Sequence, residues 1–258
     1  MRLDLYLFAN GYVKSRQKAK TLIENGGVKI DGKIIKKPSY EVGDNITISI
    51  EIKDSCPYVS RGGLKLEAII KEAKIIVNDK LCLDIGASTG GFTDCLLKHG
   101  AKRVYAVDSG TNQLDLTLKE NKNVISIENY NARNINIEDI GEAVDIITID
   151  VSFISQALIL PSAVKLLNEN GIYISLIKPQ FEVGKENIGK GGIVKDKKAR
   201  LNAVNKIIEC ARINELKCTS FIKSPIQGGD GNTEYLAVFC KNEKEISEDI
   251  IETIILRD

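Results

Sequence analysis

The sequence predicts an α/β protein in which a mostly parallel sheet is preceded by a small basic α+β unit. Three observations lead to this prediction. A buried strand at 80–83 runs into a glycine-rich turn and then a helical pattern. Three more strand-like segments follow, separated by helical stretches, and each leads into polar residues, which is typical of a parallel sheet. Residues 1–53 carry ten Lys and Arg against six Asp and Glu, whereas the rest of the chain is slightly acidic.

Length and composition bound the domain organisation. At 258 residues the chain is long enough for one large domain and a small one. A hydrophobic content of 43% and a charged content of 28% are ordinary for a soluble globular protein. Residues 53–57 read Lys-Asp-Ser-Cys-Pro and form the clearest linker. We therefore expect a small domain at 1–54, a linker at 55–60 and a larger domain at 61–258.

The small domain is expected to begin with two helices and to continue as a β-unit. The first helix is short and amphipathic and covers 2–10. Ser15 can cap a second helix that runs to about residue 25, where a Gly-Gly pair ends it. The segment 28–35 has Asp-Gly at its centre and predicts a hairpin, and a last strand is expected at 46–52.

Basic side chains crowd the second helix, whose apolar face is supplied by Ala19, Leu22 and Ile23. A charged helix is often only a solvated face, but basic clusters also bind nucleic acids. The pattern R-L-D-x-Y-L, a basic helix and then G-x-V-x-I-D-G covers residues 2 to about 50. It resembles the alpha-L RNA-binding motif of a small-subunit ribosomal protein, pseudouridine synthases and tyrosyl-tRNA synthetases. The resemblance implies RNA binding through Arg2, Lys14, Arg16, Lys18, Lys20 and Arg61.

The glycine-rich turn reads Asp84-Ile-Gly86-Ala-Ser-Thr-Gly90-Gly91, and a helix is predicted from Phe92. A strand, a glycine turn and a helix open the nucleotide site of many α/β folds, where missing Cβ atoms let a ligand approach the backbone. The spacing differs from the G-x-G-x-x-G of dinucleotide binders, and no Lys-Ser/Thr pair follows as in a P-loop. From the glycines alone, a purely structural turn remains the alternative.

The later strands favour a ligand site. Residues 103–107 are rich in β-branched and aromatic side chains and lead to Asp108, about 20 residues past the turn, where an acid binds ribose hydroxyls in nucleotide folds. A third strand at 123–127 leads into Asn-Tyr-Asn, and a fourth at 144–149 ends at Asp150. Because parallel strands present their carboxyl ends at one edge of the sheet, these polar groups predict a bound ligand there.

The rest of the larger domain is expected to complete the sheet and to cover it. A glycine-rich loop at 184–192 is long enough to be a mobile lid. The remaining predicted elements are helices at 64–74, 156–167 and 200–215, and strands at 172–177, 219–222 and 234–240.

The turn D-x-G-x-x-x-G-G resembles the first motif of class I S-adenosylmethionine (SAM) methyltransferases. The resemblance implies a Rossmann-like fold and SAM as the cofactor. It also implies that Asp84 faces the cationic amino-acid end of SAM, with no phosphate to be held. The residues expected around SAM follow the first four strands: Asp84, Gly86, Ala87, Ser88, Thr89, Gly90, Gly91, Phe92, Asp108, Asn131 and Asp150.

Four residues stand where an α/β site collects its chemistry. Asp150 and Lys178 follow predicted strands, Glu234 starts one, and Lys65 comes from the helix before the first strand. Lys-Asp-Lys-Glu in this order resembles the catalytic tetrad of FtsJ-type RNA ribose 2'-O-methyltransferases. The phrases SRGGLKLE, DIGASTGGFTD, DVSFIS, LIKPQFE and GGDGNTEYL are similar to the TlyA (haemolysin A) family of rRNA methyltransferases, and the similarity runs from residue 2 to about 240. A structural salt-bridge network is the alternative.

These residue types suit methyl transfer to a ribose. A 2'-hydroxyl is a poor nucleophile until its proton is withdrawn. The only histidine, His99, stands at a helix end before a glycine, where C-terminal capping explains it. A lysine can be the base if burial or a neighbouring cation brings its pKa toward neutrality. Lys178 fits this role, with Lys65 as the neighbouring cation and Asp150 and Glu234 orienting the pair.

The target is expected to be a ribose in rRNA. Enzymes that methylate exocyclic amines resemble one another in an Asp/Asn-Pro-Pro-Tyr/Phe after the fourth strand, whereas this chain has Asp150-Val-Ser-Phe153. The family resemblance implies a cytidine on assembled ribosomal subunits. Longer members of the family carry extensions at both ends, so the short termini here favour a single site in 23S over 16S rRNA. We expect a monomer.

Composition also disfavours other classes of protein. The six cysteines form no C-x-x-C pair and mostly lie in apolar patterns, which indicates reduced thiols in the cytoplasm and no metal site. No apolar run approaches the ~18 residues that span a bilayer, and the N-terminus lacks a signal-peptide core, so no membrane partner is expected. Two other functions stay open. One is an RNA-binding or ribosome-assembly factor with a vestigial methyltransferase site. The other is a membrane-lysing toxin, as the family's older name suggests.

Overall fold

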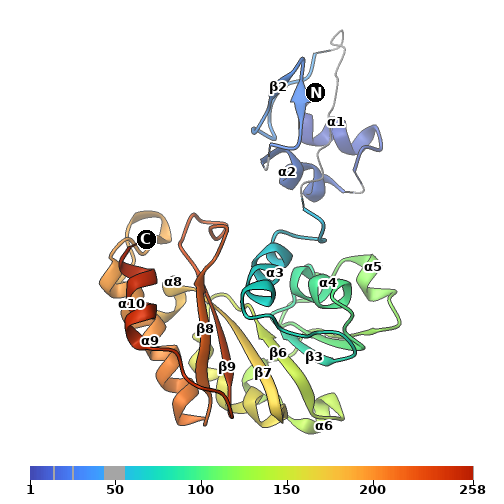
Figure 1. Ribbon diagram of the computed structural model, residues 1–258. Coiled ribbons are helices and arrows are strands. Elements are labelled where there is room, and N and C mark those ends of the chain that lie inside the picture. Colours follow the sequence, from blue (N-terminus) through green and yellow to red (C-terminus); the bar gives the residue numbers. More distant parts are fainter. Residues whose placement is uncertain (14, 25, 44–55, 258) are drawn as a thin grey trace. The chain divides into compact units, whose positions relative to one another are not determined.

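The computed structural model describes residues 1–13, 15–24, 26–43 and 56–257. The chain forms two compact units, Met1–Pro57 and Tyr58–Asp258 (Figure 1). The boundary between them falls inside the segment 55–60 that was expected to be the linker. The strand expected at 46–52 and the basic residue Lys14 lie outside the described residues.

The N-terminal unit packs two helices against a small hairpin. Helices α1 (Leu3–Ala9) and α2 (Arg16–Glu24) precede strands β1 (Lys29–Ile30) and β2 (Lys33–Ile34), which pair antiparallel. Ser15 Oγ accepts from Lys18 N at 3.1 Å and caps α2 as expected. The hairpin turn has positive φ at both central residues, as Asp-Gly predicts for a type I′ turn. The core of this unit consists of Leu3, Leu7, Ala19, Ile23, Val28, Ile30 and Val42.

The larger unit is built on a seven-stranded sheet with the order β5-β4-β3-β6-β7-β9-β8. Five neighbouring strands are parallel, as expected: β5 (Val124–Ile127), β4 (Arg103–Val107), β3 (Leu81–Ile85), β6 (Val144–Ile149) and β7 (Leu167–Ile177). The last two strands of the chain, β8 (Lys217–Lys223) and β9 (Tyr235–Cys240), make the sheet mixed, because β9 runs antiparallel to β7. The amino end of β9 therefore lies beside the carboxyl end of β7.

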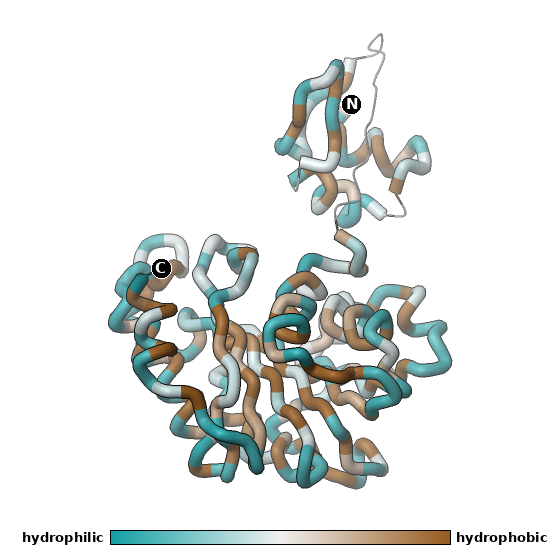
Figure 2. Tube along the Cα trace, in the orientation of Figure 1, coloured by the Kyte–Doolittle hydropathy of each residue, from teal (hydrophilic) through white to brown (hydrophobic). Residues whose placement is uncertain are grey.

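Helices cover both faces of this sheet (Figure 1). On one face α3 (Gly62–Glu72) packs against α4 (Gly91–Lys98) and contacts β8 and β9. On the other face α9 (Lys197–Ile213) buries an apolar stripe in the main core, and α10 (Glu248–Leu256) packs against α9 and β8. Apolar residues recur along the strands between these layers (Figure 2). The shorter elements are α5 (Leu116–Lys119), η1 (Ala132–Asn134), α6 (Ile137–Ile140), α8 (Pro179–Glu182), η4 (Lys185–Asn187) and η5 (Lys190–Gly192).

The prediction of a continuous helix at 156–167 is wrong. The segment instead forms three short turns, η2 (Gln156–Leu158), α7 (Leu160–Ala163) and η3 (Val164–Leu166). Pro161 explains the break, because its ring has no N–H and would clash with the carbonyl of residue 157 in a continuous helix. The chain then enters β7 at Leu167, earlier than the expected residue 172.

Candidate active site

The four residues expected to be catalytic form two ion pairs. Lys65 Nζ lies 2.5 Å from Glu234 Oε2, and Lys178 Nζ lies 2.6 Å from Asp150 Oδ1. Lys178 Nζ also donates to Ser152 Oγ at 3.0 Å. Each lysine is therefore held by one carboxylate of the set, which is the geometry that an orienting role for Asp150 and Glu234 requires.

The sheet topology explains why these residues meet. Asp150 follows β6 and Lys178 follows β7, and these strands run parallel, so both residues stand at the carboxyl edge. Because β9 is antiparallel to β7, Glu234 at its start reaches the same edge. Ile177 pairs with Tyr235, so Lys178 and Glu234, one residue beyond this pair, are neighbours.

The two ion pairs differ in exposure. The side chains of Lys65 and Glu234 are 11% and 3% exposed, so each charge is compensated mainly by its partner. The side chains of Lys178 and Asp150 are 12% and 21% exposed. The Lys178–Asp150 pair is thus the one more open to a substrate.

Gly228 makes room for Glu234, since a Cβ at this glycine would lie 2.5 Å from Glu234 Oε1. Gly228 N donates to Asn232 O at 2.9 Å and closes the turn before β9. The Asn232 side chain also holds the loop that was expected to be a mobile lid. Its Oδ1 accepts from Val194 N at 3.0 Å, and its Nδ2 donates to Gly192 O at 2.9 Å. The two glycine-rich loops are therefore joined beside Glu234, and lid motion stays a prediction.

A buried polar network ties the segment after β6 to the end of β7. Glu182 accepts from Ser155 Oγ at 2.5 Å and from Gln156 N at 2.8 Å, and it pairs with Lys206 of α9 at 3.1 Å. Gln156 Nε2 donates to Leu176 O at 2.5 Å. These bonds join the two segments that carry the Lys178–Asp150 pair, and a fully satisfied buried network of this kind is rigid.

Phe153 and Ser152 were not among the expected site residues, although they closely follow the acid of the fourth strand. Phe153 is 91% exposed, and its ring centroid lies 5.1 Å from that of Phe181. Its φ is +64°, which is rare for a bulky residue and is a kind of strain that gathers at functional sites. The exposed ring of Phe153, packed on the half-buried Phe181, offers a flat surface for a nucleic-acid base near the Lys178–Asp150 pair.

The glycine-rich turn lies at the same edge of the sheet, after β3. Gly86 has φ +83°, and a Cβ there would lie 2.3 Å from Asp150 O, so only glycine fits. Asp108 follows β4 and accepts from Ser88 N at 2.8 Å and from Gly110 N at 2.7 Å. The turn and Asp108 therefore form one hydrogen-bonded cradle beside the Lys178–Asp150 pair.

Comparison with known proteins identifies the family. The FtsJ-like methyltransferase family matches residues 58–241, and the S4 domain matches residues 1–47. The chain is 47% identical over 244 residues to Hemolysin A of Brachyspira hyodysenteriae, covering 93% of this chain and 99% of that one. It is 39% identical over 234 residues to the 16S/23S rRNA (cytidine-2'-O)-methyltransferase TlyA of Mycobacterium tuberculosis, covering 91% and 87% of the two chains. This chain belongs to the TlyA (haemolysin A) family.

A further TlyA relative is named for one rRNA only. The chain is 39% identical over 263 residues to the 23S rRNA (cytidine-2'-O)-methyltransferase TlyA of Campylobacter jejuni, covering 94% and 100% of the two chains. The family resemblance and the methyltransferase fold expected from the sequence are thereby confirmed. The match of residues 1–47 confirms that the basic N-terminal unit contains an S4 domain.

The cradle of this TlyA-family protein fits SAM in its chemistry. Two left-handed glycines let the turn pack closely, because a Cβ would clash with Asp150 O at Gly86 and with Leu118 at Gly90. Asp108 supplies carboxylate oxygens at the next strand end. The other expected contacts vary in exposure. Ala87, Gly91 and Phe92 are buried, whereas Ser88, Thr89 and Asn131 are exposed. Their contact with SAM stays a prediction.

Asp84 differs from the expectation that it faces the cationic end of SAM directly. It is fully buried, its Oδ2 accepts from Thr93 Oγ1 at 2.7 Å, and its Oδ1 accepts from Thr148 Oγ1 at 2.9 Å. The physical reason is that β3 continues to Ile85, so Asp84 lies inside the strand. Leu83 and Ile85 face the core on the α9 side, and alternation turns Asp84 to the opposite face.

The buried Asp84 predicts a pH dependence of stability. Burial raises its pKa to about 6 from 3.8, against the lowering effect of the hydrogen bonds from Thr93 and Thr148. Between these two pH values the folded carboxyl keeps a proton that the unfolded one has released. The free energy of unfolding therefore falls as pH rises through this window, by up to ~3 kcal/mol.

Asp84→Asn should remove this contribution. Urea unfolding of both proteins at pH 4, 5, 6 and 7 gives the difference between their free energies of unfolding, in which the titration of all other groups cancels. We expect that difference to shift in favour of Asp84→Asn as pH rises. A difference that stays constant with pH would contradict the assignment.

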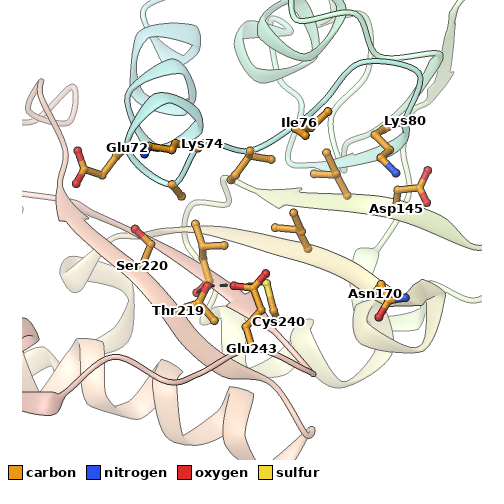
Figure 3. A pocket seen from close by; sticks show the side chains of 15 residues that line it. Glu72, Lys74, Ile76, Lys80, Asp145, Asn170, Thr219, Ser220, Cys240 and Glu243 are labelled. Carbon is orange, nitrogen blue, oxygen red and sulfur yellow. Dashed lines mark hydrogen bonds between the residues drawn. The ribbon is translucent and has the colours of Figure 1, made fainter.

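A hollow of about 450 Å³ lies elsewhere on the larger unit (Figure 3). It is bounded by the end of α3, the loop at 74–80 and strands β6 to β9, with Lys80 and Asp145 at the starts of strands and Cys240 at the end of β9. None of the expected catalytic or SAM-binding residues lines it. The hollow lies at the ends of the strands opposite to those that carry the expected catalytic residues, and it is not the candidate active site.

The basic residues expected to bind RNA lie on both units. Arg2, Arg16 and Lys18 are exposed and Lys20 is half-buried in the S4 unit, and Arg61 is exposed at the start of α3. Arg2 and Arg16 both bond to Asp4, the acid of the R-L-D-x-Y-L pattern, which was not among the residues expected to act in RNA binding.

Proposed function

We propose that this protein uses SAM to methylate the 2'-hydroxyl of a cytidine ribose in rRNA. The observation that carries the proposal is the meeting of two lysine–carboxylate pairs beside a glycine cradle at one sheet edge. Relatives named as rRNA (cytidine-2'-O)-methyltransferases support the substrate, and the S4 domain supports RNA as the partner. The proposed substrate is 23S rRNA in assembled large subunits, and the proposed place of action is the cytoplasm.

The cofactor contributes one piece of chemistry: bound SAM offers a methyl group on a sulfonium. The chain would hold it with the backbone of residues 86–91 and with the Asp108 carboxylate toward its ribose hydroxyls. Asp84 would act indirectly, by accepting hydrogen bonds that hold Thr93 at the start of α4 and Thr148 on β6.

Lys178 acts on the substrate hydroxyl. As the neutral amine, reached by loss of one proton to solvent, its Nζ would accept the 2'-hydroxyl proton. The freed oxygen would take the methyl group that bound SAM would supply. Asp150 and Ser152 hold this nitrogen at the edge of the cradle, and the Glu182 and Gln156 network limits the movement of both segments. Lys65 is fixed by Glu234 next to this position. Alignment supplies much of the remaining rate, because charge is dispersed in the transition state.

The test is methylation of purified ribosomal subunits, with the RNA digested to nucleosides and analysed by mass spectrometry. We expect 2'-O-methylcytidine in 23S rRNA from large subunits, and little in 16S rRNA or in protein-free 23S rRNA. A methyl group on a base would refute the proposed reaction. Tight binding to subunits without any methyl transfer would favour an assembly factor.

The toxin alternative has a separate test. In the described parts of the chain, no helix combines the length and apolar character needed to cross a membrane. Leakage of dye from liposomes exposed to the purified protein would support membrane lysis, and intact liposomes are the expected result.

Phe153 should contribute to RNA binding by stacking on a base. Phe153→Ala should raise the KM for subunits roughly 5- to 100-fold, the usual range for losing one base–aromatic stack, with unchanged affinity for SAM. Phe153→Gly should weaken RNA binding equally, yet stabilise the fold relative to Phe153→Ala, because glycine adopts φ +64° without strain. Ile213→Ala, at an exposed apolar residue at the end of α9, is the control. An unchanged KM for Phe153→Ala would remove the residue from the substrate site.

A further inference from the structure

A single buried carboxylate organises two exposed arginines in the S4 unit. Asp4 is 0% exposed, whereas the side chains of Arg2 and Arg16 are 49% and 51% exposed. Arg2 donates to it through Nε at 2.9 Å and Nη2 at 3.2 Å, and Arg16 donates through Nη2 at 3.1 Å. Arg2 precedes α1 and Arg16 begins α2, so Asp4 joins the starts of two helices.

The position of the Asp4 carboxylate is itself fixed. Asp4 N donates to Pro38 O at 3.1 Å, and Leu3 N donates to Tyr40 O at 2.8 Å, which anchors the first turn of α1. Burial raises the pKa of Asp4, but the hydrogen bonds and charges of Arg2 and Arg16 outweigh this effect and hold the pKa below its usual value. The carboxylate therefore stays ionised and keeps both guanidinium groups in place at neutral pH.

We propose that Asp4 is a positioning residue for RNA binding. It holds Arg2 and Arg16 as a preformed pair that binds the phosphodiester backbone. Each arginine uses part of its planar fork on Asp4 and leaves about half of its side chain open, so both can still donate to phosphate oxygens. Without Asp4, two flexible side chains would have to be ordered during binding, which weakens affinity. The inference rests on the proposed RNA-binding function.

The sign of the effect separates this role from simple electrostatics. Replacing Asp4 by Asn removes a negative charge from an RNA-binding surface, and charge alone would make binding tighter. Positioning predicts the opposite, a loss of roughly 5- to 100-fold in affinity for large ribosomal subunits. Glu24→Gln is the matched control, because it removes the same charge from an exposed position on α2 of the same unit. It should bind as tightly as the unaltered protein, or slightly more tightly.

A second comparison guards against a loss of folding. Asp4→Asn is also made in a chain that carries Arg2→Gln and Arg16→Gln. If Asp4 acts through these arginines, its replacement will no longer weaken binding in that background, whereas a general structural role would persist there. Arg16→Lys keeps the charge but loses the planar fork, so it should weaken binding without changing the slope of log affinity against log salt.

The outcomes distinguish the inference from the proposed function. If the unaltered full-length protein shows no salt-dependent binding to subunits, the RNA-binding function itself is wrong. If it binds and Asp4→Asn binds equally well or better, only the positioning role is overturned. A loss that persists in the Arg2→Gln, Arg16→Gln background would also overturn it.

Discussion

A Lys178→Ala enzyme will bind SAM and ribosomal subunits normally and will transfer methyl groups roughly 10²–10⁴ times more slowly. The substitution removes the proposed proton acceptor at the substrate hydroxyl. The Asp150 side chain that loses its partner is 21% exposed, so solvent can compensate its charge and the fold should survive.

Lys178→Arg distinguishes a general base from a purely electrostatic role. A guanidinium can still pair with Asp150, but it stays protonated at any working pH and cannot accept the hydroxyl proton. We expect Lys178→Arg to be nearly as slow as Lys178→Ala in single-turnover methylation followed by mass spectrometry. Lys185→Arg, at an exposed lysine of η4, should retain normal rates and serves as the control. A Lys178→Arg enzyme with near-normal single-turnover rates would exclude the general-base role.

Lys65→Met should lower both stability and activity. It leaves the Glu234 carboxylate, whose side chain is 3% exposed, without its partner in a buried site. Breaking a buried ion pair in this way costs about 3–5 kcal/mol of unfolding free energy. The methylation rate should fall as well, because Lys65 belongs to the proposed catalytic set.

The double variant Lys65→Met, Glu234→Gln separates these two effects. It removes both charges while keeping similar volumes, so most of the lost stability should return in denaturant unfolding, whereas the methylation rate should stay low. Rates measured well below the unfolding transition keep the two effects apart. A double variant as unstable as Lys65→Met would show that the pair is not coupled as described, and recovery of rate together with stability would reduce Lys65 to a structural role.

Local rules predicted the positions where the chain itself sets the geometry. The need for glycine at residue 86 follows from a strand-to-helix turn, and the structure shows left-handed φ there with Asp150 O in close approach. The Ser15 cap of α2 and the Asp-Gly hairpin turn are likewise decided by neighbours in sequence. The expected helix at 156–167 failed for a local reason too, since Pro161 was already visible in the sequence.

The alternation of side chains along a strand explains why Asp84 points away from the direction expected from the sequence. The sequence prediction ended the first strand at Leu83 and left Asp84 free to face a ligand. In the structure the strand includes Ile85, so Asp84 turns inward to Thr93 and Thr148. Strand ends are weakly specified by propensity, and a shift of one or two residues changes whether a side chain is at the edge or in the core.

A basic RNA-binding unit, a methyltransferase domain, the glycine turn and the four residues of the two ion pairs could all be predicted from the sequence. The sequence did not determine which lysine pairs with which carboxylate. Lys65 and Glu234 are 169 residues apart, and they meet because β9 reverses direction and brings its start to the carboxyl edge of β7. The joint hold of Asp4 on Arg2 and Arg16 also depends on how two helices pack. Strand direction, register and helix packing are settled by the burial of whole faces in the folded chain, and for that reason only the tertiary structure could decide these contacts.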